Sequence, residues 1–226
     1  MTATGTDTPA AKPDVMPIDR AEWFGAVNLS MFVNTYHQLR DVQRWVANGR
    51  AVLIIGPGQG LDAAVFRWKD YRVTTFDIDA TFQPDVIGSC HYMPMFADQQ
   101  FDAVIVSHVL EHLPPAYLDA ALAEIARVGR YALAYLPVAG RHPSVTIDLG
   151  FNSARVVAIL DLFNPLRRPD PDRPIFCGGQ HYWEIGYRGF GRRAVRRKLQ
   201  RHFHVVAEYR NRHWPPSYNF VLKSTR

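Results

Sequence analysis

Residues 52–60 read VLIIGPGQG, and this stretch decides the fold class. Four consecutive apolar residues are typical of a parallel strand buried on both faces. The glycines that follow allow a tight turn and let a ligand approach the backbone closely. Residues 61–68 can then form a helix whose first amides point back at that ligand. The stretch therefore predicts a nucleotide-type cofactor site between a strand and a helix.

The spacing of the glycines and a later aspartate refine this prediction. The turn is G-x-G-x-G, whereas dinucleotide-binding turns are G-x-G-x-x-G. A second apolar segment, residues 71–76, ends in Asp77, 17 residues after Gly60. An acidic residue at the tip of the second strand can accept hydrogen bonds from ribose hydroxyls. A turn aspartate that ends the strand is the alternative, and the order strand, turn, helix, strand favours the ribose role.

A third buried segment, residues 101–107 (FDAVIVS), is followed by residues 108–115 (HVLEHLPP). Together these segments resemble the class I S-adenosylmethionine-dependent methyltransferases, above all the group with a VLEHLP motif after strand four. Residues 84–89 (PDVIGS) and 93–95 (MPM) resemble the third-strand region of that group. The resemblance covers residues 50–138. It implies an α/β fold with a Rossmann-like, seven-stranded, mostly parallel sheet, an antiparallel last strand and helices on both faces.

The same resemblance implies S-adenosyl-L-methionine as the cofactor. It places the cofactor on Gly56, Pro57, Gly58, Gly60, Asp77, Ile78, Ser89, Cys90, Ser107 and His108. One position departs from the family pattern, because the acidic residue that contacts the adenine amino group is Ser89 here. A serine hydroxyl can accept the same hydrogen bond, so we expect a weaker adenine contact.

The chemistry of methyl transfer directs attention to histidines. The enzyme mainly holds nucleophile, methyl carbon and sulfur in line, and a base is needed where the acceptor carries a proton. His181 and Glu184 are three residues apart and are candidates for base and orienter. The alternative is a structural segment with Tyr182 and Trp183 buried.

Two further histidines follow the fourth strand, where open α/β sheets bind ligands. His112 is a second candidate for a catalytic role, and its alternative is loop organisation together with Glu111. His108 is expected to form a wall of the cofactor pocket. No metal site is expected, because His181 and Glu184 lack the H-E-x-x-H arrangement and the acidic residues form no dense ligand cluster.

The only constraint on the acceptor is the absence of a known motif after the fourth strand. The N/D-P-P-Y/F motif of amino-group methyltransferases is replaced by residues 107–110 (SHVL), which argues against nucleobase or glutamine acceptors. We therefore expect methyl transfer to a small-molecule or glycan-like acceptor at oxygen. The alternatives are a noncatalytic S-adenosylmethionine-binding or partner-binding protein of the same fold, and a nicotinamide-dependent oxidoreductase. The glycine spacing is evidence against the oxidoreductase.

Composition indicates an intracellular enzyme. The 226 residues are 47% hydrophobic, enough for one sizeable core, and no apolar run approaches the length of a membrane span. Residues 1–17 lack the basic start and apolar centre of a signal peptide, and we expect a disordered tail there. Cys90 and Cys177 are too few for a disulfide framework, so two free thiols and a cytoplasmic location are expected.

Charge is distributed unevenly along the chain. Residues 1–150 hold 11 Lys and Arg against 16 Asp and Glu, whereas residues 151–226 hold 15 against 5. Much of the positive charge lies in residues 188–201, where Val195, Leu199 and Phe203 can form one apolar stripe. A solvated amphipathic helix is the leading interpretation. An anionic acceptor or peripheral contact with a membrane surface are alternatives, and nucleic acid ranks last.

The chain is predicted to form one methyltransferase domain over residues 18–226. Residues 18–49 read as leading helices, with Phe32, Tyr36, Leu39, Gln43 and Val46 near one face. Residues 138–183 are rich in proline and are predicted to form a substrate-cap insertion, with a short helix over residues 153–163. Residues 204–209 and 218–222 are expected to pair as the terminal strands.

Overall fold

The computed structural model describes residue 25 and residues 27–148 and 155–226. The tail predicted over residues 1–17 lies outside the described residues, as do parts of the leading segment and of the predicted cap.

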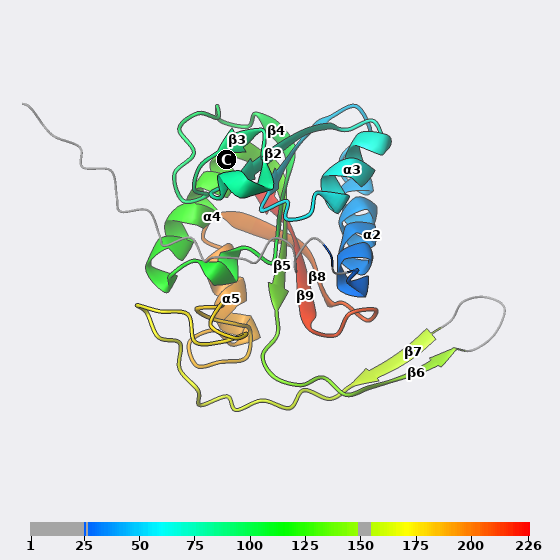
Figure 1. Cartoon of the computed structure of the whole chain (residues 1–226), viewed down its shortest axis with the longest axis vertical. Coiled ribbons are helices and arrows are strands. Elements are labelled where there is room, and N and C mark those ends of the chain that lie inside the picture. Colours follow the sequence, from blue (N-terminus) through cyan, green and yellow to red (C-terminus); the bar gives the residue numbers. More distant parts are fainter. Residues whose placement is uncertain (1–24, 26, 149–154) are drawn as a thin grey trace, which may run out of the picture.

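The centre of the molecule is a seven-stranded sheet with the order β3-β2-β1-β4-β5-β9-β8 (Figure 1). Strands β1 to β5 run parallel, and β9 runs antiparallel to both of its neighbours, β5 and β8. This is the Rossmann-like architecture with an antiparallel last strand, so the predicted fold class is confirmed. The strands are β1 (Ala51–Ile55), β2 (Arg72–Asp77), β3 (Val86–Ile87), β4 (Phe101–Ser107), β5 (Gly129–Pro137), β8 (Phe203–Arg210) and β9 (Ser217–Ser224).

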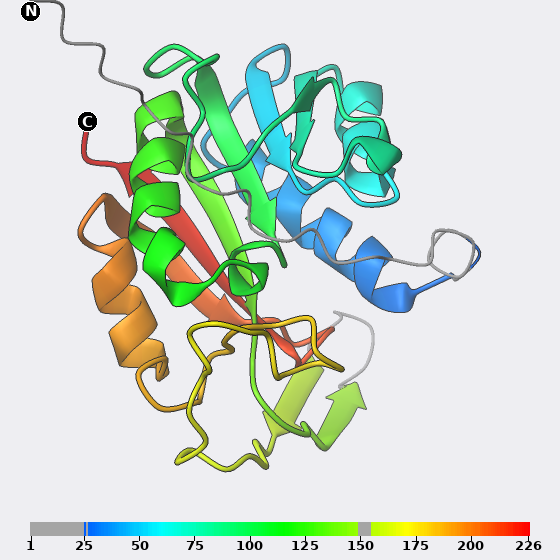
Figure 2. The same cartoon turned by 60° about the vertical axis from the view of Figure 1, so that its left-hand side comes forward.

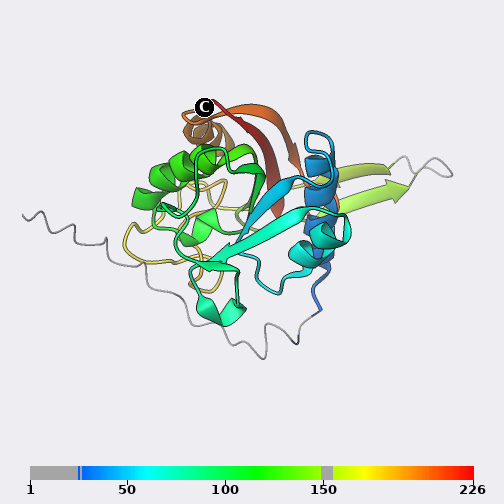
Figure 3. The same cartoon turned by 90° about the horizontal axis from the view of Figure 1, so that it is seen from above.

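Helices cover both faces of this sheet (Figures 1 and 2). α2 and α3 pack on one face, and α4 and α5 pack on the other. Seen from above, the strands fan out between these two layers (Figure 3). The helices are α2 (Leu29–Gln43), α3 (Leu61–Trp68), α4 (Leu118–Val128) and α5 (Arg192–Leu199), with short 3-10 turns η1 (Ala80–Phe82), η2 (Leu110–His112) and η3 (Pro115–Tyr117).

The apolar run of β1 shows why the strands need cover on both faces. Leu53 and Ile55 pack into the core under α4 and α5, whereas Val52 and Ile54 pack under α2 and α3. Side chains of a strand alternate between faces, so four consecutive apolar residues supply both cores. The same alternation continues in β4 and β5 and fixes their parallel register.

The buried face of α2 differs from the predicted one. Phe32 and Tyr36 are more than half exposed, whereas His37 and Asp41 are buried together with Thr35, Gln38 and Val42. The apolar spacing was misleading because this helix meets polar side chains that come from later strands. Its contact with the sheet therefore combines apolar packing of Val42 with a polar network.

That network is centred on the Asp41 carboxylate, which accepts hydrogen bonds from the hydroxyls of Tyr135 (2.8 Å) and Tyr209 (2.5 Å). His37 lies beside Tyr209, and its Nε2 is 3.0 Å from Nδ1 of His213. Hydrogen bonds to a charged acceptor contribute about 1.5–3 kcal/mol each, more than ordinary ones. The network thereby fixes the leading helix over the ends of β5 and β8.

The predicted cap segment begins as a hairpin. β6 (Ser144–Asp148) and β7 (Arg155–Ile159) pair antiparallel and project away from the main sheet (Figure 1). The helix predicted over residues 153–163 is wrong for its described part, because Arg155–Ile159 is a strand. Three β-branched side chains in that stretch favour the extended conformation.

The basic segment forms the helix that its spacing predicts. Val195 and Leu199 are buried against the sheet. Several of its cations contact groups of the same chain: Arg196 pairs with Glu208 at 3.2 Å, and Lys198 lies over the ring of Phe190. These contacts favour the interpretation as a solvated amphipathic helix, and contact with a membrane surface stays a prediction. No helix among the described residues is long and apolar enough to cross a membrane.

Stability is expected to fall in mild acid because of His37. Burial, together with the charges of Arg40 and His213, lowers its pKa from 6.5 to about 4. The folded state therefore binds this proton less well than the unfolded state, and stability is lost as pH falls from 6.5 toward 4. The total loss is roughly 3 kcal/mol, of which about 2 kcal/mol falls above pH ~5.

Urea unfolding at about pH 7.5 and 5 checks this expectation. His37→Gln should lose distinctly less stability between the two pH values than the wild-type chain, and the exposed His204→Gln should behave like the wild type. An equal loss in wild type and His37→Gln would show that other groups control the acid sensitivity.

Candidate functional site

The glycine turn lies between β1 and α3, at the carboxyl end of the parallel strands. Gly56 has a φ of +68° and donates its N–H to the Phe76 carbonyl at 2.9 Å. A Cβ at this position would lie 2.4 Å from Cγ2 of Val109, so only glycine fits without displacing that side chain. The cofactor turn is thus packed directly against the segment that follows β4.

The rest of the turn leads into α3. Gly58 and Gly60 also have positive φ, and Gly60 is the N-cap of the helix. Pro57 is buried, and the Gly60 N–H donates to its carbonyl at 2.8 Å. The turn borders a cavity of about 270 Å³. Its remaining walls come from Gln59, Ala63, Ala64, Arg67, Thr75, Phe82, Gln83 and Asp85.

Asp77 ends β2, as predicted. Its Oδ1 accepts the N–H of Asp79 at 2.9 Å, which holds the half-buried carboxylate at the strand end. Burial, reinforced by the charge of Asp79, raises the pKa of Asp77. Cys90 lies within reach of this carboxylate, and burial with the charge of Asp77 raises the pKa of its thiol to about 12. Cys90 is therefore protonated and forms an apolar wall. Ile78, which directly follows Asp77 in the sequence, is half-buried.

Ser89, which departs from the family pattern, has a partner. Its hydroxyl lies 2.6 Å from Nδ1 of His91. Burial lowers the pKa of His91, so a neutral ring can accept this hydrogen bond. A serine that donates to His91 keeps its oxygen lone pairs for another donor, such as an adenine amino group.

The segment after β4 turns sharply. Ser107 is the last residue of the strand, and His108 has a φ of +55°. The His108 N–H donates to the Tyr135 carbonyl at 2.9 Å. The short turn η2 starts only at Leu110, so His108 lies before it and outside any helix. His108 instead turns toward Glu111, with its Nδ1 3.4 Å from Oε1.

The later segment around residue 181 folds onto η2. The Tyr182 N–H donates to the Glu111 carbonyl at 2.8 Å, and His112 Nδ1 lies 2.9 Å from the Gln180 carbonyl. His181 Nδ1 lies 2.8 Å from Oε1 of Glu184, which is the pairing predicted for base and orienter. Trp183 is almost fully buried. Residues 68 and 71 positions apart in the sequence therefore meet at this edge of the sheet.

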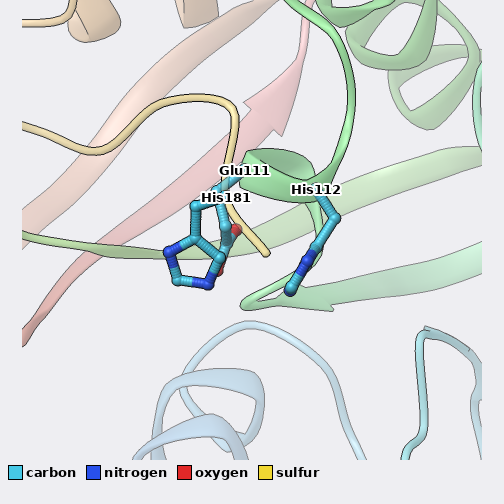
Figure 4. A group of neighbouring side chains, drawn as sticks. All are labelled: Glu111, His112 and His181. Carbon is cyan, nitrogen blue, oxygen red and sulfur yellow. The ribbon is translucent and has the colours of Figure 1, made fainter. Parts of the chain in front are cut away.

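Glu111, His112 and His181 form one cluster (Figure 4). One ligand atom from each lies within 4.8 Å of the others. Glu111 is completely buried, and the rings of His112 and His181 meet edge to face with their centroids 4.8 Å apart. No metal site was expected from local spacing, yet the folded chain assembles a ligand set that could hold an ion.

The charges within the cluster follow from its contacts. Burial alone would raise the pKa of Glu111, but His108, His112 and His181 lower it, so the carboxylate is ionised. Burial lowers the pKa of His112. For His181 burial acts in the same direction, but hydrogen bonds to Cys177 and Glu184 and the charge of Glu111 raise its pKa to about 10. In this form His181 carries a proton at neutral pH and can donate a hydrogen bond.

Comparison with known proteins now identifies the fold. Residues 53–131 match a family model described as "Methyltransferase domain". This part of the chain is therefore similar to a methyltransferase domain. The match includes the glycine turn, Asp77, Ser89 and the segment after β4. A search of curated proteins gives no match.

Solved structures share the whole fold. A protein from Pyrococcus horikoshii OT3 has a TM-score of 0.58 at 16% identity, covering 91% of this chain and 96% of that one. The 1,6-didemethyltoxoflavin-N1-methyltransferase of Burkholderia thailandensis, solved with 1,6-didemethyltoxoflavin and S-adenosylhomocysteine, has a TM-score of 0.50 at 20% identity over 95% and 94%. The glycopeptide N-methyltransferase MtfA, complexed with S-adenosylhomocysteine, has 0.55 at 13% over 84% and 90%. At these identities the likeness establishes the methyltransferase fold and no acceptor.

Sequence reasoning left Glu111 out of the site, although its histidine neighbours were included. The grouping of His108, Glu111 and His112 within five residues was the available local signal. The contribution of His181 to the same cluster had no local signal. It depends on the return of the chain after the β6–β7 hairpin.

Proposed function

We propose that this methyltransferase domain transfers the methyl group of S-adenosylmethionine to a hydroxyl group of a small-molecule or glycan-like acceptor. One observation carries the proposal. The glycine turn that would hold the cofactor packs on Val109, two residues before Glu111. The cofactor-binding turn therefore adjoins the histidine cluster of Glu111, His112 and His181.

On the cofactor side, the ribose hydroxyls would donate to Asp77, and the adenine amino group would donate to Ser89. Cys90 and Ile78 would line the adenine, and the backbone of residues 56–60 would approach the methionine portion. Ser107 and His108 would close the pocket on the side of β4. Geometry supports this arrangement, since all of these residues lie at the carboxyl ends of β1 to β4.

On the acceptor side, the transfer itself is a displacement. The acceptor oxygen forms a bond to the methyl carbon, the carbon–sulfur bond breaks, and its electron pair stays on sulfur to give S-adenosylhomocysteine. The hydroxyl proton passes to Nε2 of His112, whose Nδ1 faces the Gln180 carbonyl, and Glu184 orients the neighbouring His181 through their 2.8 Å contact. Holding the reactants in line supplies several kcal/mol more.

The choice of oxygen rests on this cluster and not on the structural neighbours. The toxoflavin and glycopeptide enzymes named above are N-methyltransferases, and their low identity to this chain supports only the shared fold. A buried carboxylate with two histidines is suited to a hydroxyl, whose proton must be removed. Product analysis that finds N-methylation would refute the choice of oxygen and leave the cofactor site intact.

An anionic acceptor is supported by a second cavity of about 290 Å³, which opens beside Pro115, three residues after His112. Arg168 and Arg188 line it, together with Pro169, Pro171, Gly189 and Phe190. Two guanidinium groups beside an aromatic ring suit a carboxylate or phosphate on an apolar body.

Paired acceptors, each in a carboxylated and a neutral form, test the charge preference. We expect the lower KM for the carboxylated form, and Arg188→Ala should raise that KM several-fold while leaving the KM of the neutral form unchanged. The exposed Arg212→Ala is the control. An equal effect of Arg188→Ala on the KM of both forms would show that Arg188 does not distinguish a charged acceptor from a neutral one.

Titration with S-adenosylhomocysteine tests the cofactor site. The wild-type chain should bind it and should not bind NADH. Asp77→Asn should weaken binding roughly 10- to 100-fold, because a charged hydrogen-bond acceptor is lost. Gly56→Ala should weaken it at least as much by displacing Val109.

Gly49→Ala is the matched control for Gly56→Ala. Gly49 also has positive φ (+81°), but a Cβ there meets nothing within 4 Å. It should lower stability by about 1 kcal/mol and leave cofactor affinity unchanged. Tight NADH binding without S-adenosylhomocysteine binding would overturn the proposed function.

A further inference from the structure

The Glu111 carboxylate is the most unusual group in the described part of the chain. It has no exposed surface, and neither oxygen makes a hydrogen bond of ordinary geometry with a described residue. The nearest imidazole nitrogen, Nδ1 of His108, is 3.4 Å away, and Nε2 of His181 is 4.0 Å away. A fully buried carboxylate that has charged neighbours but accepts no hydrogen bond is poorly compensated for its lost hydration, so such a group indicates a ligand.

The two histidines beside it are held in the orientation that a ligand needs. His112 Nδ1 faces the Gln180 carbonyl, which can only accept, so Nδ1 carries the hydrogen and Nε2 carries the lone pair. His181 Nδ1 faces the Glu184 carboxylate at 2.8 Å, which leaves its Nε2 toward Glu111, and an ion bound there would displace the proton that Nε2 carries. A carboxylate or carbonyl on the second nitrogen is the usual support for a metal-binding histidine.

We propose that Glu111, His112 and His181 bind a divalent transition-metal ion. Two imidazoles and one carboxylate suit Zn²⁺, Mn²⁺, Fe²⁺ or Co²⁺, whereas Mg²⁺ and Ca²⁺ prefer oxygen ligands. Ligand atoms about 2.0–2.2 Å from one tetrahedral ion lie roughly 3.3 Å apart. The ligand atoms here lie within 4.8 Å of one another. Side-chain movements of about 1 Å would bring them to the spacing that an ion requires.

The site has a route for entry and room for further ligands. Glu111 and His181 are buried, but His112 is exposed, so the cluster opens on one side. Three protein ligands leave at least one coordination position for water or substrate. The role of the ion rests on the proposed function: bound to the acceptor hydroxyl, it would lower the pKa of that hydroxyl and let its proton pass to water in place of His112, whose nitrogen the ion would occupy. Metal binding itself does not depend on that role.

The experiment uses the full chain, stripped of metal with a chelator and dialysed. Calorimetric titration with Zn²⁺ should give one site per chain with a submicromolar Kd. Titration with Co²⁺ should produce the visible absorption bands of a four- or five-coordinate ion. Glu111→Gln, which keeps the side-chain shape, and His181→Ala should each weaken Zn²⁺ binding at least 100-fold. His91→Ala and His204→Ala, outside the cluster, should leave it unchanged.

Cys177 needs its own control, because it is exposed and hydrogen-bonds to His181. Cys177→Ser should keep the Zn²⁺ affinity within a few-fold. If Zn²⁺ binding were lost in Cys177→Ser and kept in Glu111→Gln, the ion would not be in the cluster and the inference would be wrong.

Titration of the same samples with S-adenosylhomocysteine separates this inference from the proposed function. A chain that binds S-adenosylhomocysteine but neither Zn²⁺ nor Co²⁺ would overturn the metal site alone. A chain that binds the metals at the cluster but not S-adenosylhomocysteine would support the site and overturn the proposed function.

Discussion

The contact between Gly56 and Val109 is the constraint on which the functional edge of this molecule depends. It brings the turn after β1 against the segment after β4, at a distance that leaves no room for a side chain on residue 56. Parallel pairing of β1 with β4 sets the two strands side by side, but only the glycine lets their following loops touch. The glycine at position 56 therefore allows the cofactor turn and the histidine cluster to lie side by side.

A second set of interactions holds the acceptor side in place. The backbone of residues 180–182 bonds to η2 through Tyr182 and the His112 ring, which closes the later segment over the end of β4. On the other side of the sheet, Asp41 fixes α2 to Tyr135, whose backbone also pairs with Ser107. The edge that would hold both substrates is thus braced by polar contacts from each side.

The fold could be predicted from the sequence because its information is local. The apolar run of residues 52–55 and its repeat in residues 101–107 fix the central strands, and Gly56 and Asp77 mark their ends. The failures have a common cause. Asp41 is buried and Phe32 exposed because α2 meets tyrosines that lie about 100 residues or more further along the chain, which no helical periodicity can reveal. Within the site, the cofactor residues follow the ends of strands and can be found from the sequence. The role of Glu111 cannot, because it depends on His181, which only the folded chain brings beside it.

We propose that the cofactor-binding turn and the histidine cluster form one site. A crystal structure of the full chain with S-adenosylhomocysteine tests it most directly. The account predicts the ribose on Asp77, the adenine beside Ser89 and Cys90, and the thioether sulfur facing the cluster of Glu111, His112 and His181. A structure with the sulfur directed away from that cluster, or with the ligand bound elsewhere, would contradict it.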